Sequence, residues 1–170
     1  MSIIKVNEIQ NVAGTQNKGV LQVVSAAKTD TFTTTSTSNV DMTGMTVTLT
    51  PRSTSSQILV FGNIMGANTG DGHLWFAQLV RVISGGATAN IAINTQAGVT
   101  TQATISALSF QDYELQSNGF NFLDTTHNTT SAITYHIEVS CGANTAVFNR
   151  RADNSDQGGI SGITAMEIQG

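Results

Sequence analysis

The acidic side chains of the second half of the chain are the first candidates for catalytic chemistry. Asp112, Glu114 and Asp124 lie close in sequence. Glycoside cleavage needs two such acids held at a defined separation across a sugar. Spacing in sequence does not show that separation, and isolated surface acids are far commoner than a catalytic pair. We therefore predict no catalytic residues here and no enzyme.

Metal-ligating residue types are present but scattered. His73, His127 and His136 fall in separate segments without the paired spacing of zinc sites, and Cys141 faces away from His136 on an ideal strand. The segment 153–158 (DNSDQG) stacks oxygen-bearing side chains before a glycine, as a calcium loop does. However, Thr164 stands where the closing Glu is required. We interpret this segment as a solvated turn and predict no metal site.

Cofactor-binding and nucleic-acid-binding signals are missing as well. The chain has no phosphate-binding glycine loop of the nucleotide-binding types, and Gly159-Ile160-Ser161-Gly162 has the wrong spacing for a hydrolase elbow. Its 7 Lys and Arg form no cluster, and the formal net charge is -4. We expect no cofactor and no nucleic-acid partner. We also expect no export signal, because the first residues show no basic segment followed by a long apolar run. We expect no membrane insertion, because no apolar stretch reaches 18 residues.

The elements that must position these side chains are predicted to be strands. Only 11% of residues are charged while 39% are hydrophobic, which favours one folded domain rich in sheet over a disordered chain. Runs typical of strands recur about every dozen residues, and no helical apolar stripe is present. About ten strands are predicted, at 20–27, 39–50 with a break near Gly44, 57–67, 73–84, 89–94, 104–113, 119–124, 133–141, 146–150 and 160–169.

Two of these runs carry more detailed expectations. Ile133, Tyr135, Ile137, Val139 and Cys141 alternate with polar residues, so they predict one core-facing side and a buried, structural thiol.

The run 74–83 is apolar on both faces. Such a strand needs a second cover, either from a neighbouring subunit or from the same chain. With the first alternative, the subunit interface contains Leu74, Phe76, Val80, Val82 and Met166.

The two ends of the chain differ in what they predict. Ile163, Ala165, Met166 and Ile168 indicate a last strand paired between earlier strands, as Greek-key and jelly-roll topologies produce. Residues 1–19 are expected to form an extended arm, separate from a head domain at 20–170. The apolar residues of this arm, Ile3, Ile4, Val6 and Ile9, are candidates for anchoring it.

The ends taken together, IIKVNEIQNVAG at 3–14 and SGITAMEI at 161–168, resemble bacteriophage tail-fibre and related virion surface proteins. The segments 20–24, 45–51 and 55–60 are similar to the first strands of such modules, and 131–135 and 148–150 to their late strands. This resemblance implies a jelly-roll head of the C1q or tumour-necrosis-factor shape, usually a trimer.

The resemblance implies a virion location after synthesis in the bacterial cytoplasm. The main hypothesis is a homotrimeric surface knob for host attachment, anchored to another virion protein through its arm and facing a host glycan or protein. The alternative is a decoration or cement protein of the capsid. Receptor contacts are unknown; Trp75, Tyr113, Asn118, Phe120 and His127 form only a search list for sugar contacts.

Overall fold

The structure is a computed structural model that describes residues 19–99, 101–111, 114–153 and 156–170. The predicted anchoring residues Ile3, Ile4, Val6 and Ile9 lie outside the described residues, so the division into arm and head stays a prediction. No helix long and apolar enough to cross a membrane occurs in the described part of the chain.

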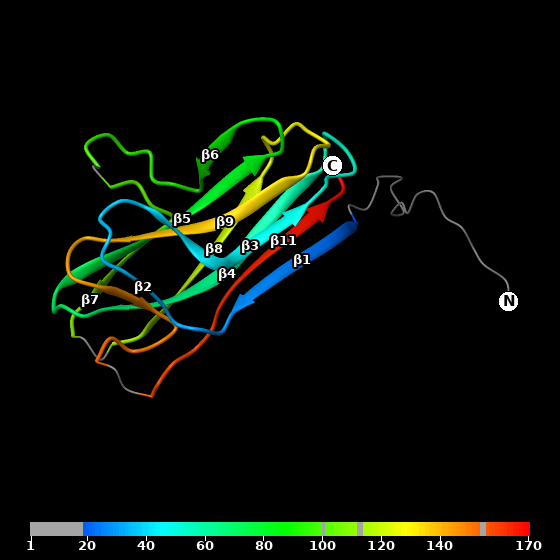
Figure 1. Cartoon of the computed structure of the whole chain (residues 1–170). Helices are drawn as coiled ribbons and strands as arrows, with labels where there is room; N and C mark the ends of the chain where they lie inside the picture. Colours follow the sequence, from blue (N-terminus) through cyan, green and yellow to red (C-terminus); the bar gives the residue numbers. More distant parts are fainter. Residues whose placement is uncertain (1–18, 100, 112–113, 154–155) are drawn as a thin grey trace, which may run out of the picture.

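The described residues form an all-β jelly-roll sandwich of eleven strands in two antiparallel sheets (Figure 1). The first sheet has the order β1-β11-β4-β10-β2, with β8 also paired to β4. Its strands are β1 (Val20–Lys28), β2 (Phe32–Thr34), β4 (Gln57–Asn68), β8 (Gln116–Asp124), β10 (Ala146–Phe148) and β11 (Ser161–Ile168). The second sheet has the order β3-β9-β5-β6, with β7 also paired to β5. Its strands are β3 (Val40–Leu49), β5 (His73–Ile83), β6 (Thr88–Ile91), β7 (Ile105–Ser109) and β9 (Ile133–Cys141).

All ten predicted strands are present, and the last one is paired on both sides. β11 lies between β1 and β4 and contacts both along its length (Figure 1). The break predicted near Gly44 is also present, because β3 shifts its register against β9 between Asp41 and Thr46. Gly44 there has φ +89°, which only glycine adopts without strain. The additional strand, β2, has only three residues and lies within a segment rich in threonine and serine, so the sequence does not distinguish it from a loop.

The core lies between the two sheets. On β9, Ile133, Tyr135, Ile137, Val139 and Cys141 are each at most 1% exposed, as their alternation predicts, and Cys141 is a buried free thiol. Trp75 packs edge-on against Phe148, with ring centroids 5.5 Å apart. A Cβ atom at Gly66 would lie 2.7 Å from the Trp75 ring, so β4 needs a glycine where this indole crosses.

Candidate assembly surface

The outer face of the first sheet carries a regular line of apolar side chains that are exposed or partly exposed. Antiparallel register places Val23 opposite Met166, Met166 opposite Leu59, and Leu59 opposite Leu123. These four residues, the apolar row, cross β1, β11, β4 and β8 in one line. Val23 is 52% and Leu123 43% exposed, while Met166 and Leu59 are partly exposed. Large apolar groups in a contiguous exposed line are typical of interaction surfaces.

The same face has no ionisable side chain on these four strands. They contain three charged residues, and all three are buried: Lys28 at 3% exposure, Asp124 at 0% and Glu167 at 0%. The next line of outward residues after the apolar row is Ser25, Thr164, Phe61 and Asn121, which is also uncharged. An interface core is depleted of charge in the same way.

A hollow adjoins the apolar row on this face. Gly162 and Gly119 flank Asn63 in register, and these glycines leave a depression whose lining includes Phe61, Asn63, Asn121 and Thr164. The Asn63 amide is held by a hydrogen bond of 3.0 Å to the backbone oxygen of Ile160. The face therefore combines an apolar line with a recess lined by amides and a hydroxyl.

Of the residues predicted for a subunit interface, Met166 lies in the apolar row. The other four lie on β5 of the second sheet. Leu74 is 36% exposed, and Phe76 and Val82 are partly exposed. Val80 is 1% exposed within a single chain, so its inclusion in an interface was wrong: the chain itself covers this part of β5. Thr101 and Gln102 line a pocket together with Phe76, so residues between β6 and β7 flank this face.

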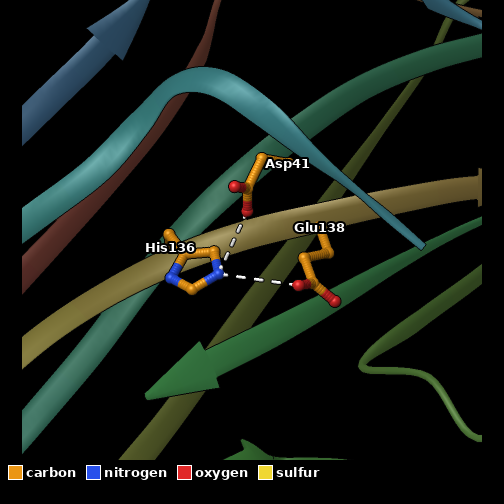
Figure 2. A group of neighbouring side chains, drawn as sticks. All are labelled: Asp41, His136 and Glu138. Atoms are coloured by element: carbon orange, nitrogen blue, oxygen red, sulfur yellow. Dashed lines mark ion pairs between the residues drawn. The ribbon is translucent and has the colours of Figure 1, made fainter. Parts of the chain in front are cut away.

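The outer face of the second sheet is apolar at Leu74, Phe76 and Val82 of β5 but polar over β3 and β9. Thr48 of β3 and Thr134 of β9 share a hydrogen bond of 2.8 Å, and Ser140 donates to Asn39 at 2.9 Å. Asp41, His136 and Glu138 converge between these pairs (Figure 2). His136 Nε2 lies 3.1 Å from Asp41 Oδ1 and 3.7 Å from Glu138 Oε1. The prediction that no metal site exists was based on the spacing of the histidines, the orientation of Cys141 and the 153–158 segment, and it did not consider Asp41.

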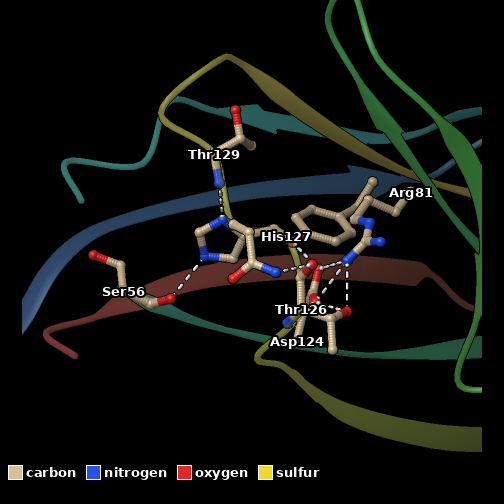
Figure 3. Close-up of polar contacts among 8 residues, drawn as sticks. Ser56, Arg81, Asp124, Thr126, His127 and Thr129 are labelled. Atoms are coloured by element: carbon tan, nitrogen blue, oxygen red, sulfur yellow. Dashed lines mark hydrogen bonds and ion pairs between the residues drawn. The ribbon is translucent and has the colours of Figure 1, made fainter. Parts of the chain in front are cut away.

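The acids considered for glycoside cleavage do not form a described pair. Asp112 lies outside the described residues. Glu114 accepts a hydrogen bond of 2.8 Å from the backbone N–H of Phe110. Asp124 is fully buried and binds Arg81 Nη1 at 2.7 and 2.8 Å (Figure 3). The Tyr135 hydroxyl donates to the same carboxylate at 2.8 Å, and the backbone N–H of Thr126 does so at 3.0 Å.

This network joins the two sheets, and the Asp124 carboxylate in it accepts hydrogen bonds from Arg81, Thr126 and Tyr135. Burial alone would raise the pKa of Asp124, but the hydrogen bonds from Arg81, Thr126 and Tyr135 hold it below its ordinary value. Burial raises the pKa of Tyr135, and the charge of Asp124 raises it further. A carboxylate held in its ionised form by three donors is suited to a structural role rather than to proton transfer.

The search list for sugar contacts is largely buried. Trp75, Phe120 and His127 are at most 8% exposed, which removes them as surface contacts. His127 instead connects the loop after β8 to the residue that precedes β4. Its Nε2 lies 2.7 Å from the backbone oxygen of Ser56, and its Nδ1 accepts from the Thr129 N–H at 3.3 Å (Figure 3). Tyr113 lies outside the described residues, and Asn118 is partly exposed.

The segment 153–158, interpreted from the sequence as a solvated turn, is described only in part. Residues 154 and 155 lie outside the described residues. Beside them, Asp153 forms an ion pair of 2.5 Å with Arg151, whose guanidinium also donates to Gln157. The observed partner of this acid is therefore a cation of the chain.

Comparison with known proteins identifies no family: no family model and no curated protein sequence matches the chain. Among solved structures, the chain is similar to a chain of infectious bursal disease virus, Gx strain, with 15% identity and a TM-score of 0.48. That alignment covers 98% of this chain and 37% of the viral chain. A chain of the Gt strain of this virus is 13% identical, and the alignment covers 98% of this chain and 47% of the viral chain with a TM-score of 0.44. The VP2 subviral particle of the same virus is 12% identical, with 97% of this chain and 45% of the viral chain aligned and a TM-score of 0.44. The chain thus spans less than half of these viral chains, and at TM-scores below 0.5 the likeness carries no functional inference.

Proposed function

We propose that the protein is a structural component of a bacteriophage particle, a self-associated surface knob that takes part in host attachment. The virion assignment is supported by the tail-fibre resemblance of its sequence segments. The self-association is supported by one observation above all, the apolar row on an uncharged sheet face. Obligate interfaces are the protein surfaces with this character, because they resemble a domain core cut in half.

The first-sheet face fits a contact between copies better than a contact with a charged surface. Its exposed groups are aliphatic, thioether, amide and hydroxyl groups, so a second copy can cover it without leaving a buried charge unpaired. Closed rings are the usual form of such assemblies. We propose three copies around this face, in keeping with the trimer that the jelly-roll resemblance implies.

The N-terminal arm and the loops of the sandwich are proposed to bind other molecules. Ile3, Ile4, Val6 and Ile9 would add a strand to the sheet of another virion protein, which is a common mode of peptide binding. Loops of the sandwich would then face a host glycan or protein, as loops on a rigid scaffold commonly carry recognition.

Two lysine substitutions test which face is covered. Leu123→Lys places a charge at the end of the apolar row, and Leu74→Lys places one at a comparably exposed position of β5. We expect Leu123→Lys to weaken self-association at least tenfold in sedimentation equilibrium, and Leu74→Lys to leave it unchanged. The reverse result would move the interface to the second sheet. Equal melting temperatures would show that both variants fold.

Particle imaging tests the position on the virion. A gold-labelled tag on the chain should appear at the tail if the knob serves attachment. Label spread over the capsid faces would contradict the attachment role and support the alternative, a decoration or cement protein of the capsid.

A further inference from the structure

We propose that Asp41, His136 and Glu138 form a binding site for one divalent transition-metal ion on the outer face of the second sheet. The three side chains offer one imidazole nitrogen and two carboxylates, and their ligand atoms all lie within 4.8 Å of one another (Figure 2). This site is independent of the proposed assembly surface, which lies on the other sheet.

The backbone itself brings the three residues together. Asp41 of β3 is the direct cross-strand partner of Glu138 on β9. His136 lies two residues before Glu138 and therefore on the same face of the sheet. The register shift between Asp41 and Thr46 lies beside them, and β3 is an edge strand of its sheet. The pairing of β3 with β9 therefore keeps the three side chains close together whatever rotamers they adopt.

The distances match those between ligands of one small ion. Zinc binds histidine nitrogen and carboxylate oxygen at about 2.0–2.2 Å, so two tetrahedral ligands lie about 3.3 Å apart. His136 Nε2 is 3.1 Å from Asp41 Oδ1 and 3.7 Å from Glu138 Oε1. Two of the three separations between ligand atoms are therefore near this value, and the third, between Asp41 and Glu138, is within 4.8 Å. A site with three protein ligands also leaves a coordination position for water or another molecule.

Charge gives a second reason to expect a cation. Two carboxylates directly opposite each other on neighbouring strands destabilise a sheet. Within the described residues, His136 is the only ion-pair partner of Asp41 and of Glu138. The facing residues on β5 are Gln78, opposite Glu138, and Val80, opposite His136, and neither supplies positive charge. A divalent ion would neutralise both carboxylates while the imidazole stays neutral.

The ligand types indicate the class of ion. Imidazole nitrogen favours zinc and its neighbours in the first transition series, whereas calcium and magnesium prefer oxygen ligands alone. Ions of this class would join β3 to β9 beside the register shift. Binding to the folded chain raises its stability in proportion to the logarithm of ion concentration above the dissociation constant.

The test uses untagged, full-length protein treated with a chelator and then dialysed. Titration calorimetry with ZnCl2 should give one ion per chain. In thermal melts, ZnCl2 should raise the Tm in a saturable way, and CaCl2 and MgCl2 should have weaker effects. Cobalt should give absorption bands of a nitrogen- and oxygen-coordinated ion. Asp41→Asn and His136→Gln should each lower zinc affinity at least tenfold. His73→Gln, a histidine outside the cluster, should not change it.

Two outcomes would overturn the site. One is the absence of saturable binding up to millimolar zinc, which would leave the cluster as contacts of His136 with its two acids. The other is zinc binding that neither Asp41→Asn nor His136→Gln weakens, which would place the ion elsewhere. Asp41 is exposed, with 71% of its side chain accessible, so Asn at this position is expected to leave folding intact.

Discussion

The two outer faces of the sandwich differ in kind although both belong to antiparallel sheets of the same small domain. The first face presents the apolar row and keeps the charged residues of its four long strands inside, as with Glu167 at 0% exposure. The second presents hydroxyls, amides and the Asp41–His136–Glu138 cluster over β3 and β9, and the apolar Leu74, Phe76 and Val82 on β5. A sheet face that meets only water has no reason to exclude charge. This difference is the observation on which the proposed cover of the first face by another copy rests.

The charged residues inside the first sheet are stabilised individually. Glu167 accepts hydrogen bonds from the backbone N–H of Arg52 at 2.7 Å and from the Gln22 amide at 2.5 Å. Lys28 pairs with Asp30 at 2.9 Å. These partners offset part of the cost of burying the charged groups, so the charges can lie inside while the outer face stays uncharged.

The largest expected effect comes from removing a charge that the first sheet buries. Asp124→Ala leaves Arg81 without its partner and the Tyr135 hydroxyl without its acceptor, so the free energy of unfolding should fall by about 3–5 kcal/mol. Urea denaturation measures this. The matched control, Asp71→Ala in an exposed turn, should change stability by less than about 0.5 kcal/mol. Equal, small effects of both variants would show that charges under the first face are not structural.

Acid should weaken the fold through the same buried carboxylates. Burial alone would raise the pKa of Glu167, but hydrogen bonds from Gln22 and the Arg52 backbone hold it below its ordinary value, and the pKa of Asp124 is lowered as well. A lowered pKa in the folded state gives stability that is complete above the unfolded value, about 4, and is lost as the pH falls through the folded value. Melting temperatures should therefore change little from pH 7 to 5 and fall below pH 4. Glu167→Gln should show a smaller acid-induced loss, and an identical loss would contradict this assignment.

The smallest effect is expected on the outer face of the second sheet, where exposed polar pairs contribute little to the free energy of unfolding. Thr48→Val removes one hydroxyl from the pair with Thr134 but keeps a β-branched side chain. Cross-strand pairs of this type contribute about 0.2–1 kcal/mol, so the change in unfolding free energy should stay below about 1 kcal/mol, as measured by urea denaturation. A loss as large as that of Asp124→Ala would mean that this face is not an ordinary solvent-facing surface.

Alternation within single strands was enough to predict most of the fold. The period of two from Ile133 to Cys141 predicted which side of β9 faces the core, and the apolar run near the C-terminus predicted a strand paired on both sides. The apolar row was not predictable, because Val23, Leu59, Leu123 and Met166 meet only through the registers of four strands distant in sequence. Of these, only Met166 was suggested by its own segment.

The cluster of Asp41, His136 and Glu138 was not predictable from the sequence for the same reason. The strand pattern places His136 and Glu138 on one face, but the position of Asp41 depends on where β3 shifts its register against β9. Val80 was assigned to an interface because sequence shows that a face is apolar, not which part of the chain covers it. Pairing between distant strands, rather than propensity, is the information that sequence reasoning lacked.

Sedimentation velocity of the untagged protein at low and high NaCl tests the central claim most directly. Contacts through an uncharged face should not depend on screening. We expect one species with three times the 17.8 kDa mass of the chain at both salt concentrations. A monomer at micromolar concentration, or an assembly that dissociates in high salt, would contradict self-association through the first-sheet face.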